Sequence, residues 1–142
     1  MQFDRHDRNI LEILQADGRI AMTALAERMR RLQRDGVIAG FRAVLSPAAL
    51  GRGLTAFVEV KLDRTSSDAF DDFAKVIRRM DGVEDCHMVA GGFDYLLKTR
   101  HRDMAAYRAF LSETLLELPG VRETRTYAVM EVVVEHAALP LP

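Results

Sequence analysis

The chain of 142 residues is 49% hydrophobic and carries a formal net charge of −1, and this length can bury one ordinary core or two small ones. The first residues are polar, and no apolar run approaches the roughly 18 residues of a membrane-spanning helix, so we expect neither secretion nor a membrane anchor. The single cysteine, Cys86, cannot form an internal disulfide, which fits a protein of the reducing cytoplasm.

Two short amphipathic helices are predicted in the first 38 residues. The first begins after Asp4 or Asp7, runs for about three turns and ends near Asp17. Thr23 can cap the second, which continues at helical register until Gly36 ends it. Their apolar stripes consist of Ile10, Leu11, Ile13, Leu14, Leu25, Ala26 and Met29.

Positive charge is concentrated in this front part of the chain. Residues 1–45 hold eight arginines and six acidic residues, whereas residues 46–142 carry a net charge of −3. The excess lies in the second helix, at Arg28, Arg30, Arg31 and Arg34. Such a cluster can neutralise phosphates, although a solvated helix face explains it equally well.

A linker separates the front helices from a second domain. Residues 37–45 alternate like a strand, Ser46-Pro47 breaks the pattern, and the next residues form a short turn. We therefore predict a first domain over residues 1–38, a linker strand and turn over 39–53, a second domain over 54–136 and a tail over 137–142.

The second domain contains the clearest periodicity. It begins with a strand over residues 54–62 and a helix that ends at Asp81-Gly82. Two short strands follow over 83–90 and 95–101, joined by the hairpin connection Gly91-Gly92-Phe93-Asp94. A second helix, capped by Asp103 and ended by Pro119-Gly120, then leads to a long strand from Val121 to about Glu135. Val83 and Val121 both open a strand after a helix, 38 positions apart. The order β-α-β, twice, predicts a ferredoxin-like α+β domain, in which two helices cover one face of a four-stranded antiparallel sheet.

The other face of that sheet is predicted to need a cover. In residues 129–134 apolar side chains point both ways, so one set would meet the helices and the other a partner. Homodimerisation through the two sheets is the economical solution. Alternatively, the N-terminal segment folds over the sheet.

Short motifs along nearly the whole chain occur in a particular order and spacing. They are Asp7, Ile10-Leu11, Leu14, Gly18-Arg19, Leu25-Ala26, Arg31-Leu32, Gly36-Val37-Ile38, Gly40-Phe41, Ala43-Val44-Leu45, Leu50-Gly51, Phe57-Val58-Glu59-Val60, the Gly91–Asp94 loop with Tyr95, and Gly120-Val121 with Thr124 and Thr126. Together they resemble the Lrp/AsnC family of leucine-responsive and asparagine-operon transcription regulators. The resemblance implies a winged helix-turn-helix domain before the ferredoxin-like domain.

One departure from the family is large. There, a glycine-containing turn and a third helix, which enters the major groove, follow the second helix; here roughly a dozen residues are absent between Met29 and Arg30. Either the protein has lost this recognition helix, or the chain as written lacks a stretch that the complete protein contains. The second explanation is favoured because Ile10, Leu14 and Leu25 would otherwise have little to pack on.

The resemblance also implies partners and sites. The protein would be a cytoplasmic, sequence-specific regulator that binds double-stranded DNA and assembles into homodimers, then tetramers or octamers of dimers. The arginines that would hold DNA phosphates are Arg19, Arg28, Arg30 and Arg31. An amino-acid effector would bind at an oligomer interface near Gly91, Gly92, Asp94, Tyr95, Thr124 and Thr126. From the residues alone, the glycines would merely shape the turn and Asp94 would bond its own backbone.

Two other classes of function stay open. A dimeric ferredoxin-like protein could bind a small molecule or be an enzyme, with Cys86, His87 and His101 as the obvious groups, but no metal-ligand spacing or nucleophile–base pair can be read from them. We therefore predict no catalytic residues, no metal and no cofactor. If the recognition helix is truly lost, a regulator without DNA-binding capacity that acts through mixed oligomers is the third possibility.

Overall fold

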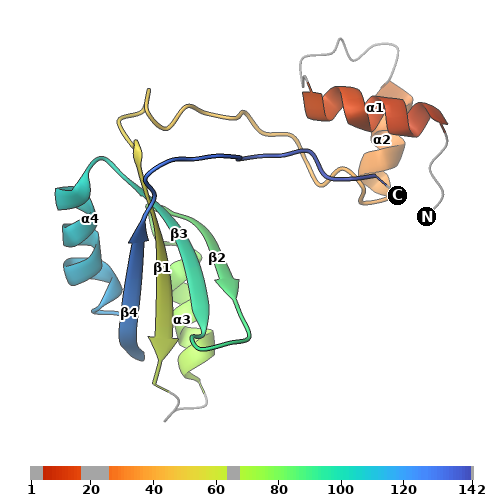
Figure 1. The fold of residues 1–142 in the computed structure, drawn as a ribbon. Helices are drawn as coiled ribbons and strands as arrows, with labels where there is room; N and C mark the ends of the chain where they lie inside the picture. Colours follow the sequence, from red (N-terminus) through yellow and green to blue (C-terminus); the bar gives the residue numbers. More distant parts are fainter. Residues whose placement is uncertain (1–4, 17–25, 64–67, 142) are drawn as a thin grey trace. The chain divides into compact units, whose positions relative to one another are not determined.

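The computed structural model describes residues 5–16, 26–63 and 68–141 (Figure 1). The chain divides into two compact units. The first contains residues 1–44 together with residues 133–142, and the second contains residues 45–132. The C-terminal tail thus belongs to the same unit as the front helices.

The first unit is built on two helices, α1 (Arg5–Ala16) and α2 (Ala26–Arg34). Their buried faces meet in a small core. It consists of the buried residues Ile10, Leu11, Met29 and Leu32, with Leu14, Val37, Ile38 and Leu141 packed against it. The chain leaves α2 through Gly36, whose φ of +76° is the left-handed conformation that ends helices. The predicted cap at Thr23 and the predicted helix end near Asp17 lie outside the described residues.

Helix α2 passes through Met29 and Arg30 without interruption. Met29 and Leu32, three positions apart on one face, are only 1% and 2% exposed. Ile10 and Leu14 therefore have partners, and the expectation that they lack packing without a third helix is wrong, whereas Leu25 lies outside the described residues. The physical reason is that α2, residues 37–38 and Leu141 together cover them.

The strand predicted over residues 37–45 does not form, although the turn that follows it does. A period of two predicts an extended chain, but a strand also needs a hydrogen-bonding neighbour. Phe41, Val44 and Leu45 are 55%, 76% and 64% exposed. The last strand is shorter than predicted for the same reason: it ends at Ala128, and Met130 and Val133 beyond it are exposed.

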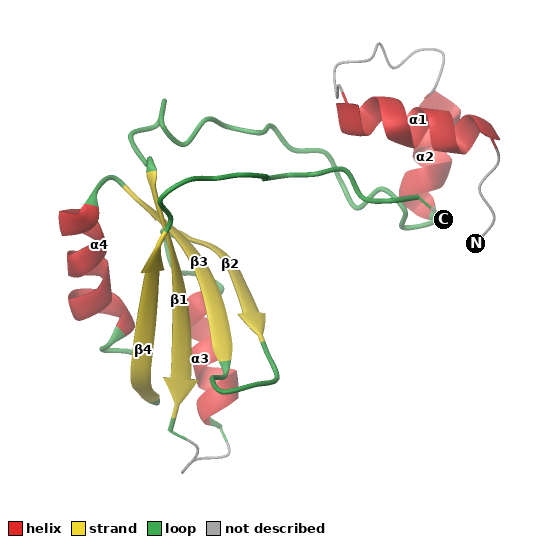
Figure 2. Cartoon of the chain, viewed as in Figure 1, coloured by secondary structure: helices red, strands yellow, loops and turns green. Residues whose placement is uncertain are grey.

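The second unit contains a four-stranded antiparallel sheet of order β2-β3-β1-β4. Its elements are β1 (Leu54–Leu62), α3 (Ala69–Ile77), β2 (Val83–Met88), β3 (Tyr95–His101), α4 (Met104–Phe110) with the π-helical turn η1 (Leu111–Leu115), and β4 (Val121–Ala128). The predicted ferredoxin-like α+β fold and its hairpin between β2 and β3 are confirmed (Figure 2). The predicted cap of α4 is confirmed as well, since the Asp103 carboxylate accepts a hydrogen bond from the Ala106 N–H at 2.8 Å.

Both helices pack on the same face of this sheet. Val58 and Val60 of β1 and Leu97 of β3 meet Phe73 of α3 and Tyr107 of α4 in one buried core. Because side chains alternate along a strand, Phe57, Glu59 and Lys61 point to the opposite, open face. The apolar residues 129–134, from which a cover for this face was predicted, lie beyond the end of β4 and do not belong to the sheet.

Candidate effector and DNA-binding sites

A pocket of about 330 Å³ lies where the β2–β3 loop meets the ends of β1 and β4. Gly92 and Phe93 come from the loop, whereas the strands contribute mainly charged side chains. The strand residues that line it are Glu59, Lys61, Glu123, Thr124 and Arg125. We call this cavity the loop pocket.

Opposite charges face one another across the strands of the loop pocket. Glu59 of β1 pairs in register with Arg125 of β4, and Lys61 pairs with Glu123. The Tyr127 hydroxyl donates a hydrogen bond to the Glu59 carboxylate at 3.0 Å. A hydrogen bond with the Tyr127 side chain, together with the nearby carboxylates of Glu59 and Glu123, raises the pKa of Arg125. The pocket therefore offers both signs of charge to a small ligand.

Asp94 holds the β2–β3 loop in position through buried hydrogen bonds. It is only 4% exposed, and its carboxylate accepts a hydrogen bond from the Leu62 N–H at 2.8 Å. Its own N–H donates to the Val60 carbonyl, and its carbonyl accepts from the Val89 N–H, both at 3.0 Å. These bonds tie the loop to the end of β1 and hold Gly92 and Phe93 in place.

The structure separates the other predicted effector residues. Tyr95 points to the helix side, where its ring packs on Phe73 with centroids 4.7 Å apart. The Thr126 hydroxyl hydrogen-bonds that of Tyr107, also on the helix side. Of the six predicted residues, Gly92 and Thr124 line the loop pocket, Asp94 supports the loop, and Gly91 is exposed beside Gly92.

Sequence reasoning missed the four charged residues of the loop pocket. Their signal was present in the alternation of residues 54–62, where Glu59 and Lys61 occupy the positions that point away from the helices. The matching positions of β4, Glu123 and Arg125, could be assigned only with the register of the β1–β4 pair.

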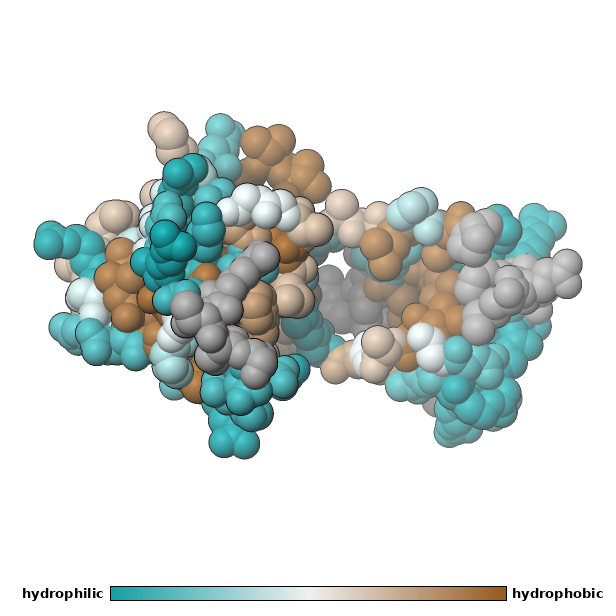
Figure 3. Space-filling view, turned by 90° about the horizontal axis from the view of Figure 1, so that it is seen from below, coloured by the Kyte–Doolittle hydropathy of each residue, from teal (hydrophilic) through white to brown (hydrophobic). Residues whose placement is uncertain are grey.

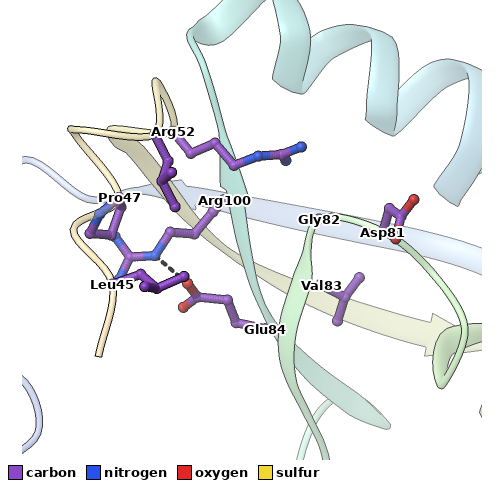
Figure 4. A pocket seen from close by; sticks show the side chains of 9 residues that line it. Leu45, Pro47, Arg52, Asp81, Gly82, Val83, Glu84 and Arg100 are labelled. Atoms are coloured by element: carbon purple, nitrogen blue, oxygen red, sulfur yellow. Dashed lines mark hydrogen bonds and ion pairs between the residues drawn. The ribbon is translucent and has the colours of Figure 1, made fainter. Parts of the chain in front are cut away.

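A second cavity, of about 460 Å³, lies at the other end of β3 (Figure 4). Its walls include Leu45 and Pro47 from the turn before β1 and Arg100 from β3, whose Nε donates to the Glu84 carboxylate at 2.5 Å. None of the predicted effector residues lines it. The neighbouring His101 is 6% exposed, and burial, followed by the positive charge of Arg52, lowers its pKa.

The predicted DNA-contacting arginines differ in their surroundings. Arg28 and Arg31 both form ion pairs with Asp7 of α1, which is only 3% exposed, so they join the two helices. Arg30 points away from this pair, and its side chain is 73% exposed beside Glu27. Arg19 lies outside the described residues.

The groups considered for catalysis do not form a cluster. His87 is exposed on β2, and burial raises the pKa of the Cys86 thiol, which makes it less reactive at neutral pH. Within residues 5–16, 26–63 and 68–141, no three His, Cys, Asp or Glu side chains are placed to hold a metal ion. The same residues contain no helix that is long and apolar enough to cross a membrane.

A small helical unit joined to a ferredoxin-like unit with a charged pocket is the arrangement expected of a regulator with separate DNA-binding and ligand-binding domains. The comparisons with known proteins agree: residues 3–29 match the AsnC-type helix-turn-helix domain, and residues 55–139 match the Lrp/AsnC ligand binding domain. The chain belongs to the Lrp/AsnC family of DNA-binding transcription regulators.

Relatives support this assignment over nearly the full chain. The leucine-responsive regulatory proteins of Escherichia coli K12 and Klebsiella pneumoniae are each 50% identical over 141 residues, covering 92% of this chain and 86% of the relative. A transcriptional regulator of Neisseria meningitidis in complex with L-methionine has a TM-score of 0.90 at 31% identity, with 98% and 97% of the two chains covered. An AsnC family regulator of Agrobacterium tumefaciens has a TM-score of 0.87 at 29% identity, with 97% of each chain covered.

The alignment with the leucine-responsive proteins also contains a gap. The alignment extends over 141 positions, but it includes only 92% of the 142 residues of this chain, which is about 131 residues. About ten positions of the relatives therefore have no counterpart in this chain. The helix-turn-helix match ends at Met29, the residue after which sequence reasoning placed the missing stretch.

Proposed function

We propose that this regulator responds to an amino acid bound in the loop pocket. The observation that carries the proposal is the meeting of Lys61 and Arg125 with Glu59 and Glu123 beside the backbone of Gly92. A cavity of about 330 Å³ is within the range of small-molecule sites. Structures of related regulators hold L-methionine, in the proteins of Neisseria meningitidis and Mycobacterium tuberculosis.

The charges suit a zwitterion. Lys61 and the loop N–H groups would attract the ligand's carboxylate, and Glu59 or Glu123 its ammonium group. Phe93 would contact an apolar side chain. Asp94 contributes indirectly, through the hydrogen bonds that position the loop.

Calorimetric titration with L-leucine and L-methionine tests this site. Lys61→Ala is expected to weaken binding at least tenfold, because it removes a positive charge from the pocket wall. Lys75→Ala is the matched control, since Lys75 is an exposed residue of α3 outside the pocket. Equal affinity of the two variants would contradict the proposal.

We also propose that the open sheet face is an interface between copies of this chain. Phe57 and Leu96 are half-buried there, and Tyr127 is 46% exposed, so the face presents apolar surface among its charges. A twofold contact would cover both copies at once. Sedimentation of the purified protein should give a dimer or a larger even assembly, and Phe57→Glu should shift it toward monomer; an unshifted assembly would place the interface elsewhere.

For DNA, Arg30 is the best-placed phosphate contact on α2 because its side chain is the most exposed of the predicted set that the structure describes. A gel shift with the protein's own upstream DNA tests it. Arg30→Ala should weaken binding to all sequences alike and lower the salt slope by about one. Loss of sequence discrimination with unchanged non-specific affinity would contradict a phosphate role.

A second candidate is a regulator that acts through mixed oligomers with a relative that has the full helix-turn-helix. The continuity of α2 through Met29–Arg30 and the ten or so positions missing from the alignment favour it. The intact mass of the expressed protein would first show whether a longer chain exists. Mixing the protein with a leucine-responsive regulator should then weaken that regulator's gel shift; an unchanged shift would exclude this candidate.

A further inference from the structure

An apolar groove runs along the first unit. It measures about 890 Å³ and is bounded by Leu11, Leu14 and Gln15 of α1, by the extended residues 37–44 and by the tail residues 139–141. Apolar residues gather on one part of the visible surface of this unit (Figure 3). Arg42 is the only charged side chain among the residues that the structure describes along this groove.

The C-terminal tail forms one wall of this groove, where it is held against α1. The Leu139 N–H donates to the Gln15 Oε1 at 2.7 Å, and the Gln15 Nε2 donates to the Leu139 carbonyl at 3.5 Å. One side-chain amide thus pairs with both backbone groups of one tail residue, as a neighbouring strand would. In Figure 1 this tail is the C-terminal end drawn in blue beside α2.

The two leucines of the tail have different roles. Leu141 is half-buried and packs against the core formed by Ile10, Leu11, Met29 and Leu32. Leu139 is 76% exposed, so it contributes its backbone and not its side chain. Pro140 between them has a fixed φ and no N–H to satisfy, which lowers the entropy lost when the tail is ordered.

The core beneath the tail needs such a cover. A helix-turn-helix domain has a third helix to pack on the first two, whereas the match to that domain ends here at Met29 and α2 continues directly into residues that follow the gap. Among the described residues, the two helices contribute four buried core residues, which is little apolar surface for a unit of this size.

We propose that α1 and the small core of the first unit form a binding surface for the chain's own C-terminal segment, residues 137–141, and that this segment takes over the packing role of the missing third helix. The contact forms within one chain. Its specificity comes from the Gln15 amide, which pairs with the backbone at Leu139, and from the apolar site for Leu141 two residues further on.

Hydrogen exchange followed by mass spectrometry tests the proposal, because α1 and α2 can be read separately from the sheet. Leu141→Ala in the full chain should speed exchange in α1 and α2 at least threefold and leave β1 and β3 unchanged. Leu139→Ala is the matched control and should change neither unit. Gln15→Met, which removes both amide bonds, should behave like Leu141→Ala.

A chain that ends at Ala138 provides the second arm. Its α1 and α2 should lose protection at least tenfold, and a synthetic peptide of residues 137–142 added in millimolar excess should restore it, whereas the same peptide with Leu141→Asp should not. Equal exchange in the Leu139 and Leu141 variants, or full protection in the shortened chain, would overturn the proposal. Protection that rises with protein concentration would also overturn it, because the tail would then come from a second copy.

Discussion

Substitutions of Asp94 distinguish two possible roles of this residue, which are to support the β2–β3 loop and to contact a ligand. Its buried carboxylate accepts a hydrogen bond from the Leu62 N–H, so Asp94→Ala leaves a donor without that acceptor at the end of β1. An unsatisfied buried group of this kind costs about 1–3 kcal/mol. For a unit of this size, a loss of about 2 kcal/mol lowers the midpoint of thermal unfolding by roughly 8–16 °C.

Asp94→Asn is the informative companion. It keeps an oxygen acceptor for Leu62 but removes the charge, so the free energy of unfolding should fall by less than about 1 kcal/mol. Because the carboxylate faces the backbone of β1 and Asp94 does not line the loop pocket, the affinity for L-methionine should stay within about threefold of the wild type.

Thermal unfolding followed by circular dichroism measures the stability, and calorimetric titration measures the affinity for L-methionine on the same samples. An Asp94→Ala variant as stable as the wild type would refute the structural role of the carboxylate. An Asp94→Asn variant that keeps its stability but loses binding would show that Asp94 contacts the ligand itself.

Further predictions concern stability. Burial lowers the pKa of His101 from 6.5, so the neutral form is favoured in the folded state. The second unit should therefore keep its full stability above about pH 6.5 and lose part of it as the pH falls toward the lowered pKa. In unfolding curves, His101→Phe should remove this pH dependence. Phe73→Ala should cost about 3–5 kcal/mol in the same assay, because Phe73 is fully buried between α3 and the sheet; a loss below about 1 kcal/mol would contradict that packing. Arg31→Ala should destabilise the first unit by about 1 kcal/mol through Asp7, whereas Arg30→Ala should have no measurable effect, and equal changes would refute the Asp7 pairing.

The sheet was predictable from the sequence where one strand face is buried and the other exposed. Residues 54–62 alternate cleanly, and the strand has those bounds. Residues 37–45 and 129–135 have patterns that are also extended, but the sequence does not show whether a neighbouring strand exists to accept their hydrogen bonds. The periodicity of a segment thus predicts an extended conformation, whereas strand pairing depends on the rest of the chain.

The candidate site was predictable only in part. Gly92 was identified through a resemblance and lines the loop pocket, whereas Tyr95 and Thr126 lie on the helix side of the sheet. Thr124 borders the pocket, but it pairs with Val60 and so occupies a helix-side position of β4 as well. The charged pairs of the loop pocket depend on the register of β1 with β4, which is a long-range property. The packing of the tail on the helices could not be read from its six residues at all.

The order of the chain makes the ligand-binding unit an insertion within the helical unit, because the latter is assembled from both ends of the polypeptide. Ala56 of β1 pairs with Ala128 of β4, so the chain enters and leaves the sheet side by side. The two connections between the units therefore begin at neighbouring strands of the sheet. Residues 1–44 expressed alone would be an unfinished unit, whereas a circular permutant in which the tail precedes residue 1 would contain every segment of that unit in one stretch.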